Sequence, residues 1–382
     1  MKKEKNNNQI KGKIECWSRV PFILSGKFGA LNEGSTVSFL VKELSFKSIY
    51  KEINPNKFVL EINDVTQRFA ISKIENKEKI EKGTLEALLC GYLHEVLAKS
   101  TKEYTGFKMK ITSKIFITNG VETNFLVNLI LSTYKHYGVE YRNEDVCDTI
   151  CKILREYYGK VVSINSVLAL FHSDITRFDN DGDVIKKEKL ENPDRFAYVL
   201  FYNGPKLTLD GYNEFYNKIL NVYDRVKEVF HVNLLRKVTK EQRFQYLYNQ
   251  ISPLTDAEKL IITHYYEENN RAQQIAEGFN DEEKNIGKFF DALNMSLAEQ
   301  AGYLGLNKVN KFLETTVYKS TYPKKEIALS ILNESNINKF VFIVPQKDLE
   351  FLKNYLKGLE NYKFTVIHPC GESIEIKKYE GD

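Results

Sequence analysis

The stretch from residue 107 to residue 131, FKMKITSKIFITNGVETNFLVNLIL, constrains the fold more than any other part of the chain. Its first residues alternate between apolar and polar, which predicts a half-buried strand. A turn at Thr118-Asn119-Gly120 follows, and the apolar residues beyond it recur at helical spacing, with Thr118 or Asn119 as the expected N-cap. A strand, a glycine turn and a helix can direct backbone N–H groups at a phosphate, but they also form an ordinary connection in many proteins.

The turn itself has few features of a phosphate-binding loop. It contains one glycine and no lysine, and Glu122 lies where an anion would sit. A carboxylate at that place repels a triphosphate unless a metal ion lies between them. Two interpretations stay open for Glu122. It can coordinate magnesium, because carboxylate oxygen suits that ion, or it can simply complement the helix dipole.

Composition and charge narrow the class of protein. The 382 residues suffice for two domains, and 42% hydrophobic residues with 23 tyrosines and 24 phenylalanines predict a packed globular protein. The net charge is +4, and the lysine-rich start, MKKEKNNNQIKGK, is interpreted as a solvated tail. Nucleic-acid binding through the basic surface is a weaker alternative, but basic motifs with interleaved aromatic residues are lacking, so no nucleic-acid partner is expected. No apolar run approaches the ~20 residues that span a bilayer, so no membrane partner is expected either.

The cysteines indicate a reducing compartment. There are five, an odd number without regular spacing, which favours a cytoplasmic location. Cys147 and Cys151 lie one helical turn apart, but no second pair supplies the remaining ligands of a zinc site. They are interpreted as core thiols, and no metal site is predicted.

The order of expected elements is α+β. Strands are expected at 14–26, where Pro21 interrupts regular pairing, and then at 28–41, 46–53 and 57–74. Helices are expected at 83–100, at 143–158 and from about Ser166, and a strand at 196–204 closes the first half. Helices dominate 210–320, and the chain ends with a strand at 339–344, a helix at 347–359 and a strand at 362–369. We therefore expect an N-terminal domain at 1–204 and a C-terminal domain at 205–382.

Several segments in the second half resemble a known family. Residues 264–271 match H-x-x-x-E-N-x-R, residues 203–213 resemble N-S-x-V-K-x-x-L followed by E-Y-N, and residues 235–238 resemble L-R-D-V. In this order, and over nearly the whole chain, they resemble galactokinase, a member of the GHMP sugar-kinase superfamily. The resemblance implies a two-lobed GHMP-kinase-like fold, with a mixed α/β N-terminal lobe and a helix-rich C-terminal lobe that contains a small ferredoxin-like sheet.

The family's sugar-binding motif, R-V-N-L-I-G-E-H-T-D-Y-N-x-G, aligns with residues 19–34, here two residues longer. The resemblance implies a catalytic position at Arg19 and substrate-binding positions at Gly26, Asn32 and Gly34. The family's sugar-binding Glu, His and Asp fall on Lys27, Phe28 and Ala30. Phenylalanine and alanine supply no hydrogen-bonding groups for a sugar hydroxyl.

The other family motifs are altered as well. P-x-G-x-G-L-S-S-S-A falls on the opening stretch, which implies cofactor-binding positions at Asn119, Gly120, Glu122 and Thr123. A-E-x-x-x-x-G-x-x-x-G-I-M-D-Q aligns with residues 153–166, which implies Asn165 at the catalytic aspartate and Leu154 at the metal-approaching glutamate. The glycine-rich motif G-A-G-F-G-G is replaced by residues 332–338, a run without glycine.

Taken together, these changes predict a galactokinase-like protein whose catalysis is impaired, that is, a pseudokinase that acts in ligand sensing or protein interaction within carbohydrate metabolism. The expected partner is a small sugar or a protein, and no cofactor is expected. The alternative is a working ATP-dependent sugar kinase with an atypical site, which converts ATP and galactose to galactose 1-phosphate and requires ATP and magnesium.

Overall fold

The chain forms two compact units, each built from separated stretches of sequence. The computed structural model describes residues 12–28, 33–53, 56–100, 105–115, 117, 120–182, 184–191, 193–202, 208–248, 252–280, 286–309, 326–358 and 363–379. The first unit comprises Met1–Arg19, Leu44–Tyr158 and Ile374–Asp382, and the second comprises Val20–Glu43 and Gly159–Ser373. The sequence predicts two consecutive domains that meet at residue 204. That division differs in kind from these two units, and it stays a prediction.

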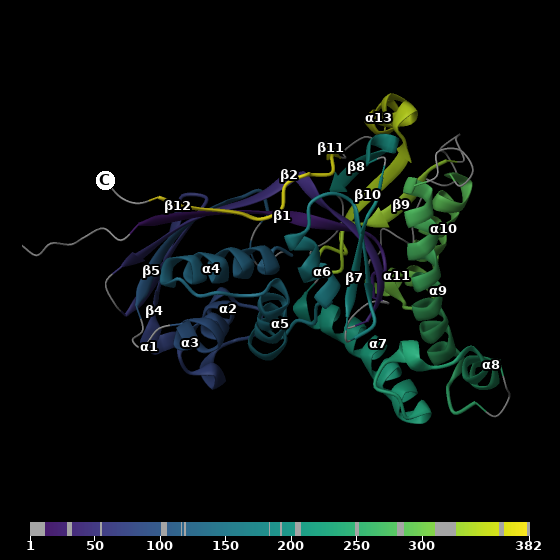
Figure 1. Cartoon of the computed structure of the whole chain (residues 1–382), viewed down its shortest axis with the longest axis horizontal. Coiled ribbons are helices and arrows are strands. Elements are labelled where there is room, and N and C mark those ends of the chain that lie inside the picture. The colour runs from purple at the N-terminus through teal and green to yellow at the C-terminus, as the bar shows by residue number, and fades with distance from the viewer. Residues whose placement is uncertain are drawn as a thin grey trace, which may run out of the picture. The chain divides into compact units, whose positions relative to one another are not determined.

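The first unit contains a mixed sheet in the order β12-β1-β2-β5-β3-β4 (Figure 1). β12 pairs with β1, β2 with β5 and β3 with β4 in antiparallel fashion, whereas β3 and β5 run parallel. The strands are β1 (Lys13–Ser25), β2 (Gly34–Ile53), β3 (Lys57–Ile62), β4 (Val65–Ala70), β5 (Gly106–Ser113) and β12 (Glu375–Tyr379). β1 up to Arg19 and β2 from Leu44 belong to this unit, and the rest of both strands belongs to the second.

Helices gather on one side of this sheet, with α2 and α4 prominent in Figure 1. The helix α4 is buried from Glu122 to Thr133. It carries Asn128, whose Nδ2 donates to the carbonyl oxygens of Cys16 at 3.1 Å and Phe46 at 3.3 Å. A polar face can therefore lie against the sheet, because the amide is bonded to strand backbone. The helical segments of this unit are α1 (Ile71–Ile74), η1 (Lys77–Lys79), α2 (Leu85–Tyr92), η2 (Leu93–Leu97), α3 (Ala98–Ser100), α4 (Glu122–Tyr137), α5 (Asn143–Ile153) and η4 (Leu154–Tyr158).

The second unit contains a four-stranded antiparallel sheet in the order β11-β8-β10-β9. Its strands are β8 (Phe196–Tyr202), β9 (Ala328–Ile331), β10 (Lys339–Pro345) and β11 (Lys363–Ile367). A hairpin of β6 (Thr176–Asn180) and β7 (Ile185–Lys189) pairs with the start of β2. One hydrophobic cluster joins this sheet to α7 and α9. The helical segments are α6 (Ile164–Leu168), η5 (Ala169–Phe171), η6 (Pro193–Arg195), α7 (Leu209–Phe230), η7 (Leu235–Lys237), α8 (Lys240–Tyr248), α9 (Asp256–Asn280), α10 (Ile286–Gly302), α11 (Leu306–Val309), η9 (Gln346–Asp348) and α13 (Leu349–Lys357).

The α+β organisation with a small antiparallel sheet is confirmed, but some expected strands are wrong. Pro21 does not interrupt β1, because the strand backbone around it is hydrogen-bonded to residues 332 and 333. The Pro21 carbonyl accepts from Asn333 Nδ2 at 2.7 Å, and Ile23 N–H donates to Leu332 O at 2.9 Å. The two strands expected at 28–41 and 46–53 contribute to a single strand, β2. The hairpin β6–β7 and the strand β12 were not expected. None of the described helices is long and apolar enough to cross a membrane.

Candidate functional site

The first group of predicted site residues lies at the start of α4, in the first unit. The helix begins at Glu122 with Val121 at the N-cap, and the Val121 side chain makes no capping hydrogen bond. The expected cap at Thr118 or Asn119 is therefore wrong, and both residues lie outside the described part of the chain. Gly120 has a φ of +102°, and its N–H donates to Glu122 Oε1 at 3.3 Å. Glu122 thus bonds the turn that precedes its own helix.

The carboxylate of Glu122 is buried, with 3% of the residue exposed. Its Oε1 also accepts a hydrogen bond from the Tyr158 hydroxyl at 3.2 Å. Burial, and then the negative charge of Glu122, raise the pKa of Tyr158 above its usual value, so this tyrosine stays a donor. Thr123, the next predicted position, is also buried. Over the described residues, no group of three or more His, Cys, Asp or Glu side chains could hold a metal ion.

Arg19 lies on β1 and is connected to α4 through Asn124. The Asn124 Nδ2 donates to the Arg19 carbonyl at 3.0 Å and to Ser18 Oγ at 3.0 Å. The structure therefore bonds the backbone of Arg19 to the helix that carries Glu122 and Thr123. Asn124 forms these hydrogen bonds because it lies on the face of α4 that is directed toward β1. The sequence alone does not show which face of the helix meets this strand.

The second group of predicted site residues centres on Asn165, in α6 of the second unit. Asn165 is fully buried. Its Nδ2 donates to the Gly34 carbonyl at 3.3 Å and to Thr36 Oγ1 at 3.1 Å, and its Oδ1 accepts from Asn180 Nδ2 at 3.3 Å. These bonds connect α6 to β2 and β6. Asn165 and Gly34, two predicted site positions, are thus joined by a hydrogen bond, and the whole Asn165 amide is bonded to neighbouring strands.

Gly26 belongs to the same unit and makes a close backbone approach. Its φ is +82°, and a Cβ there would lie 2.2 Å from the Ser35 carbonyl oxygen, so no other residue fits. Its N–H donates to Glu268 Oε2 at 2.9 Å. Ser35 N–H donates to Asn269 Oδ1 at 2.7 Å. Glu268 and Asn269 of the H-x-x-x-E-N-x-R segment therefore bind the backbone at Gly26, within the sugar-binding motif, and at Ser35, directly after it.

The remaining members of that segment form a buried charge network between α9 and α10. Arg271 binds Glu268 at 3.0 Å and reaches both carboxylate oxygens of Glu299, at 2.9 and 2.5 Å. The Nδ1 of His264 lies 3.1 Å from Glu299 Oε2. A network of this kind holds Glu268 in place for Gly26, since a bidentate arginine–carboxylate pair fixes geometry as well as charge.

Lys27, at the position of the family's sugar-binding glutamate, points into the protein. It is fully buried, and its Nζ donates to Ser330 Oγ at 2.8 Å and to the Leu24 carbonyl at 3.2 Å. Burial lowers the pKa of its ammonium group to about 7, although Glu268 and Glu334 act in the opposite direction. The side chain is therefore committed to the interior.

Phe28, at the position of the family's sugar-binding histidine, is part of the hydrophobic core of this unit. Its ring packs edge-on against Phe215, with centroids 5.2 Å apart, and lies 5.4 Å from Tyr216. Its φ is +61°, which is rare for a bulky residue and needs strong packing to hold it. Its N–H donates to Glu334 Oε1 at 2.7 Å.

Glu334 is a functional candidate that sequence reasoning missed. It lies in the run 332–338 that replaces the glycine-rich motif, and it is 2% exposed. Besides the Phe28 N–H, it accepts the Ser166 hydroxyl at 2.9 Å on its other oxygen. Burial raises the pKa of its carboxyl, while these two donors and Lys27 oppose the rise. The only signal in the sequence is an acidic residue between asparagines, which by itself predicts a surface turn.

Two predicted positions, Asn32 and Asn119, lie outside the described residues, as does the run 203–207. The others form two groups. In the second unit, Gly34 and Asn165 share a hydrogen bond, and Gly26 lies against Ser35. In the first unit, the Arg19 backbone, Gly120, Glu122 and Thr123 lie around the first turn of α4.

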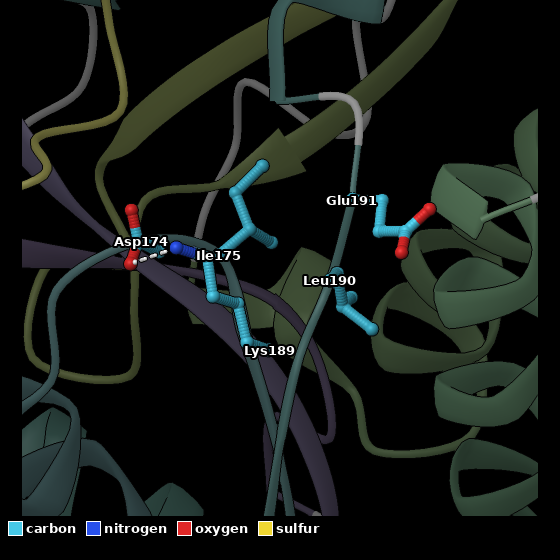
Figure 2. A pocket seen from close by; sticks show the side chains of 5 residues that line it. All are labelled: Asp174, Ile175, Lys189, Leu190 and Glu191. Atoms are coloured by element: carbon cyan, nitrogen blue, oxygen red, sulfur yellow. Dashed lines mark ion pairs between the residues drawn. The ribbon is translucent and has the colours of Figure 1, made fainter.

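A hollow of about 340 Å³ lies beside the hairpin β6–β7 in the second unit (Figure 2). It is lined by Asp174, Ile175, Lys189, Leu190 and Glu191, and Lys189 forms an ion pair with Asp174 at 2.8 Å. None of the predicted site residues lines it. Its ion pair joins an exposed lysine to a partly exposed carboxylate, an arrangement that adds little stability.

The fold is that of the GHMP kinases. A galactokinase from Lactococcus lactis solved with galactose superposes with a TM-score of 0.76 and 15% identity, over 95% of both chains. Mevalonate kinase from Methanococcus jannaschii gives a TM-score of 0.60 at 15% identity, over 96% of this chain and 99% of that one. A D-glycero-D-manno-heptose 1-phosphate kinase from Bacteriodes thetaiotaomicron gives 0.59 at 10% identity, with the same coverage. No family model matches the sequence, and no curated protein matches it in sequence.

Proposed function

We propose that this protein is a galactokinase-like pseudokinase, which has lost sugar phosphorylation and acts in the cytoplasm as a sugar sensor or as a protein-binding subunit. The observation that carries the proposal is Asn165. It stands where the resemblance places the aspartate that handles the proton of the acceptor hydroxyl, and both ends of its amide are bonded to the scaffold. An amide has no useful basicity, so it cannot act as the general base.

The sugar side supports the same conclusion. Lys27 and Phe28 take the places of two residues that would hydrogen-bond a sugar, and both are fully buried. Lys27 is bonded to Ser330, and Phe28 is packed against Phe215. A sugar hydroxyl needs partners that it can reach, and neither side chain offers one.

The phosphate side is also altered. Leu154 stands at the position of the metal-approaching glutamate and is fully buried in η4. Glu156, two residues later, is exposed and lies 3.8 Å from Lys77. Phosphoryl transfer depends on charge neutralisation around the transferred group, and these residues do not provide a metal ligand there.

The second candidate function is an active sugar kinase with an atypical site. It is favoured by Glu122, a carboxylate at the start of a 16-residue helix and beside the Gly120 N–H. If magnesium binds this carboxylate, the metal would offset its repulsion of a triphosphate. In that case the protein would need ATP and magnesium as cofactors.

Isothermal titration calorimetry on the full chain separates the candidates. The pseudokinase proposal expects no binding of magnesium-ATP, whether galactose is present or not. Tight magnesium-ATP binding that is lost in Glu122→Gln would favour the active kinase. Binding of galactose without binding of magnesium-ATP would support the sugar sensor. If neither galactose nor magnesium-ATP binds, the result would favour the protein-binding subunit.

A further inference from the structure

The sheet of the first unit has one face that is turned away from α4. Ser18 and Ser48 hydrogen-bond to Asn124 and Asn128 of that helix, so the even-numbered residues of β1 and of this part of β2 face it. The odd-numbered residues of both strands therefore lie on the opposite face, because side chains alternate along a strand. The strand registers extend the assignment to β5, β3, β4 and β12.

This outer face is strongly basic. The three central strands contribute one acidic residue, Glu15, and six basic residues, Lys13, Arg19, Lys47, Lys51, Lys108 and Lys110. The flanking strands add Lys57, Arg68 and Lys377, against Glu61 and Glu375. The nine basic and three acidic side chains of these strands have a net charge of +6, whereas the whole chain carries +4. One further carboxylate reaches the face from the turn between β3 and β4, where Asp64 binds Lys110 at 3.1 Å. We call this outer face the basic face.

The register of the strands places like charges opposite each other at its centre. Lys51 of β2 pairs directly with Lys108 of β5. Lys108 binds Glu61 at 3.0 Å, but Lys51 has no ion-pair partner among the described residues. Like charges directly opposite each other on neighbouring strands destabilise a sheet. A bound polyanion would remove that repulsion.

Two aromatic side chains lie on the same face. Trp17 is the only tryptophan in the chain, and its ring centroid lies 4.5 Å from Lys47 Nζ. Tyr379 is 45% exposed, and its ring centroid lies 5.3 Å from Lys13 Nζ. Each ring is thus accompanied by a cation, the combination that accepts a base by stacking and its phosphate by charge.

We propose that the basic face binds single-stranded nucleic acid, with the lysines and Arg19 at the phosphates and with Trp17 and Tyr379 stacking on bases. An open sheet that combines basic and aromatic side chains is a recurring surface for single strands. A second copy of the chain does not fit, because two faces of the same net charge repel. An anionic membrane is a poorer fit, since binding at a bilayer gains from apolar side chains that insert, and charges dominate this face. The proposal does not depend on kinase chemistry.

The expectation from the sequence was no nucleic-acid partner, since no basic motif with interleaved aromatics occurs. The residues of the basic face come from six strands that span residues 13–379, and only their registers bring them together. This proposal replaces that expectation.

The test uses the full chain and a fluorescein-labelled oligouridylate of about 20 nucleotides, followed by anisotropy. We expect binding that weakens roughly 50-fold between 50 and 200 mM salt, the fall for about four neutralised phosphates. Quenching of tryptophan fluorescence by unlabelled oligouridylate reports on this face directly, because Trp17 is the only tryptophan. The same measurements with oligothymidylate show whether RNA is required.

Variants locate the binding surface. Lys51→Glu with Lys108→Glu should weaken binding at least about 10-fold, and Lys51→Gln with Lys108→Gln repeats the test without new negative charge. Tyr379→Ala should weaken binding about 5-fold, the lower range for one stacked base. The matched control is Lys186→Glu with Lys187→Glu, two exposed lysines of β7 in the other unit, which should leave binding within about two-fold. Thermal melting confirms that each variant is folded.

Three results would overturn the proposal. The first is an unchanged tryptophan signal while anisotropy rises. The second is an equal loss of binding in the β7 control. The third is binding to vesicles of phosphatidylserine and phosphatidylcholine without binding to either oligonucleotide, which would assign the face to a membrane surface.

Discussion

The two groups of predicted site residues are used differently by the fold. In the second unit, Asn165 has partners at both ends of its amide, and Lys27 and Phe28 are part of the interior. On α4 in the first unit, the buried Oδ1 atoms of Asn124 and Asn128 have no hydrogen-bond partner among the described residues. The side chains of Lys27, Phe28 and Asn165 are thus bonded or packed, whereas two amides of α4 have an oxygen that no described residue bonds. Over the described part of the chain, the second unit has unbonded buried polar atoms of its own, such as Ser25 Oγ and the Tyr216 hydroxyl. We therefore expect the proposed loss of activity to depend mainly on Asn165, Lys27 and Phe28.

The largest effect is expected from Phe28→Ala. Removing a fully buried phenylalanine should lower the free energy of unfolding by about 3–5 kcal/mol, measured by urea denaturation. Phe28→Gly should be about 1–2 kcal/mol more stable than Phe28→Ala, because only glycine adopts a φ of +61° at little cost. The control is Phe351→Ala, at a residue 42% exposed, where a change within about 0.5 kcal/mol is expected. Equal losses at positions 28 and 351 would show that Phe28 is not a core residue.

The next effect is that of Asn165→Asp, which restores the family's residue. It should cost roughly 3 kcal/mol at pH 7, because a carboxylate cannot donate to Gly34 O and would be buried without a cation. Burial should raise the pKa of the new carboxyl above its unfolded value of about 3.9, so the penalty should shrink as the pH falls toward 4. Asn354→Asp, on the exposed side of α13, is the matched control. A variant as stable as the parent at pH 7 would contradict the buried network.

A pH-dependent effect is expected at Lys27. Its pKa is about 7 in the folded protein and near 10.5 when unfolded, so the folded state binds fewer protons between these values. Stability of the parent should therefore rise with pH in this window, at most about 1.4 kcal/mol per pH unit for one proton. Lys27→Met should lack this dependence. Denaturant titrations of both proteins at pH 7, 8 and 9 provide the measurement, and parallel pH profiles would show that the amine is charged and solvated.

The smallest effect is expected in the first unit. Tyr158→Phe removes one hydrogen bond to Glu122 and should cost about 1 kcal/mol. It should also remove one of two donors to Glu122 Oε1, because the Gly120 N–H still donates to the same oxygen. If calorimetry shows that the variant binds magnesium while the parent does not, ligand binding is more easily restored at the start of α4 than in the second unit. A loss above about 3 kcal/mol would show that both regions are equally built into the core.

Sequence reasoning predicted the fold class because periodicity and segment order depend on local sequence. The alternation before residue 113 and the helical spacing after Gly120 specify β5 and α4 directly. The hairpin β6–β7 was missed, because β7 is the highly charged IKKEK, which has no apolar alternation. β12 was missed for a different reason: its pairing with β1 joins residues more than 350 positions apart.

The sequence predicts site positions, which stay a prediction, but it does not show the hydrogen bonds that join them. Alignment indicated that Lys27 and Phe28 replace sugar-binding residues, but the direction of their side chains follows from the φ of +61° at Phe28 and from its packing on α7. Glu334 could not be predicted as a site residue because its partners, Phe28 and Ser166, are about 306 and 168 residues away in sequence. Contacts between residues so far apart in sequence depend on the tertiary fold, and patterns in a single sequence do not show them.

The central claim is that the chain does not phosphorylate sugars, and sugar-dependent ADP release measures this most directly. The account predicts no turnover above background for the unmodified protein with magnesium-ATP and galactose or a panel of related sugars. It predicts the same for Asn165→Asp, because a restored base helps only when sugar and phosphate are already placed within reacting distance. Turnover by the unmodified protein would contradict the account, and turnover in Asn165→Asp alone would show that the sugar position is intact despite Lys27 and Phe28.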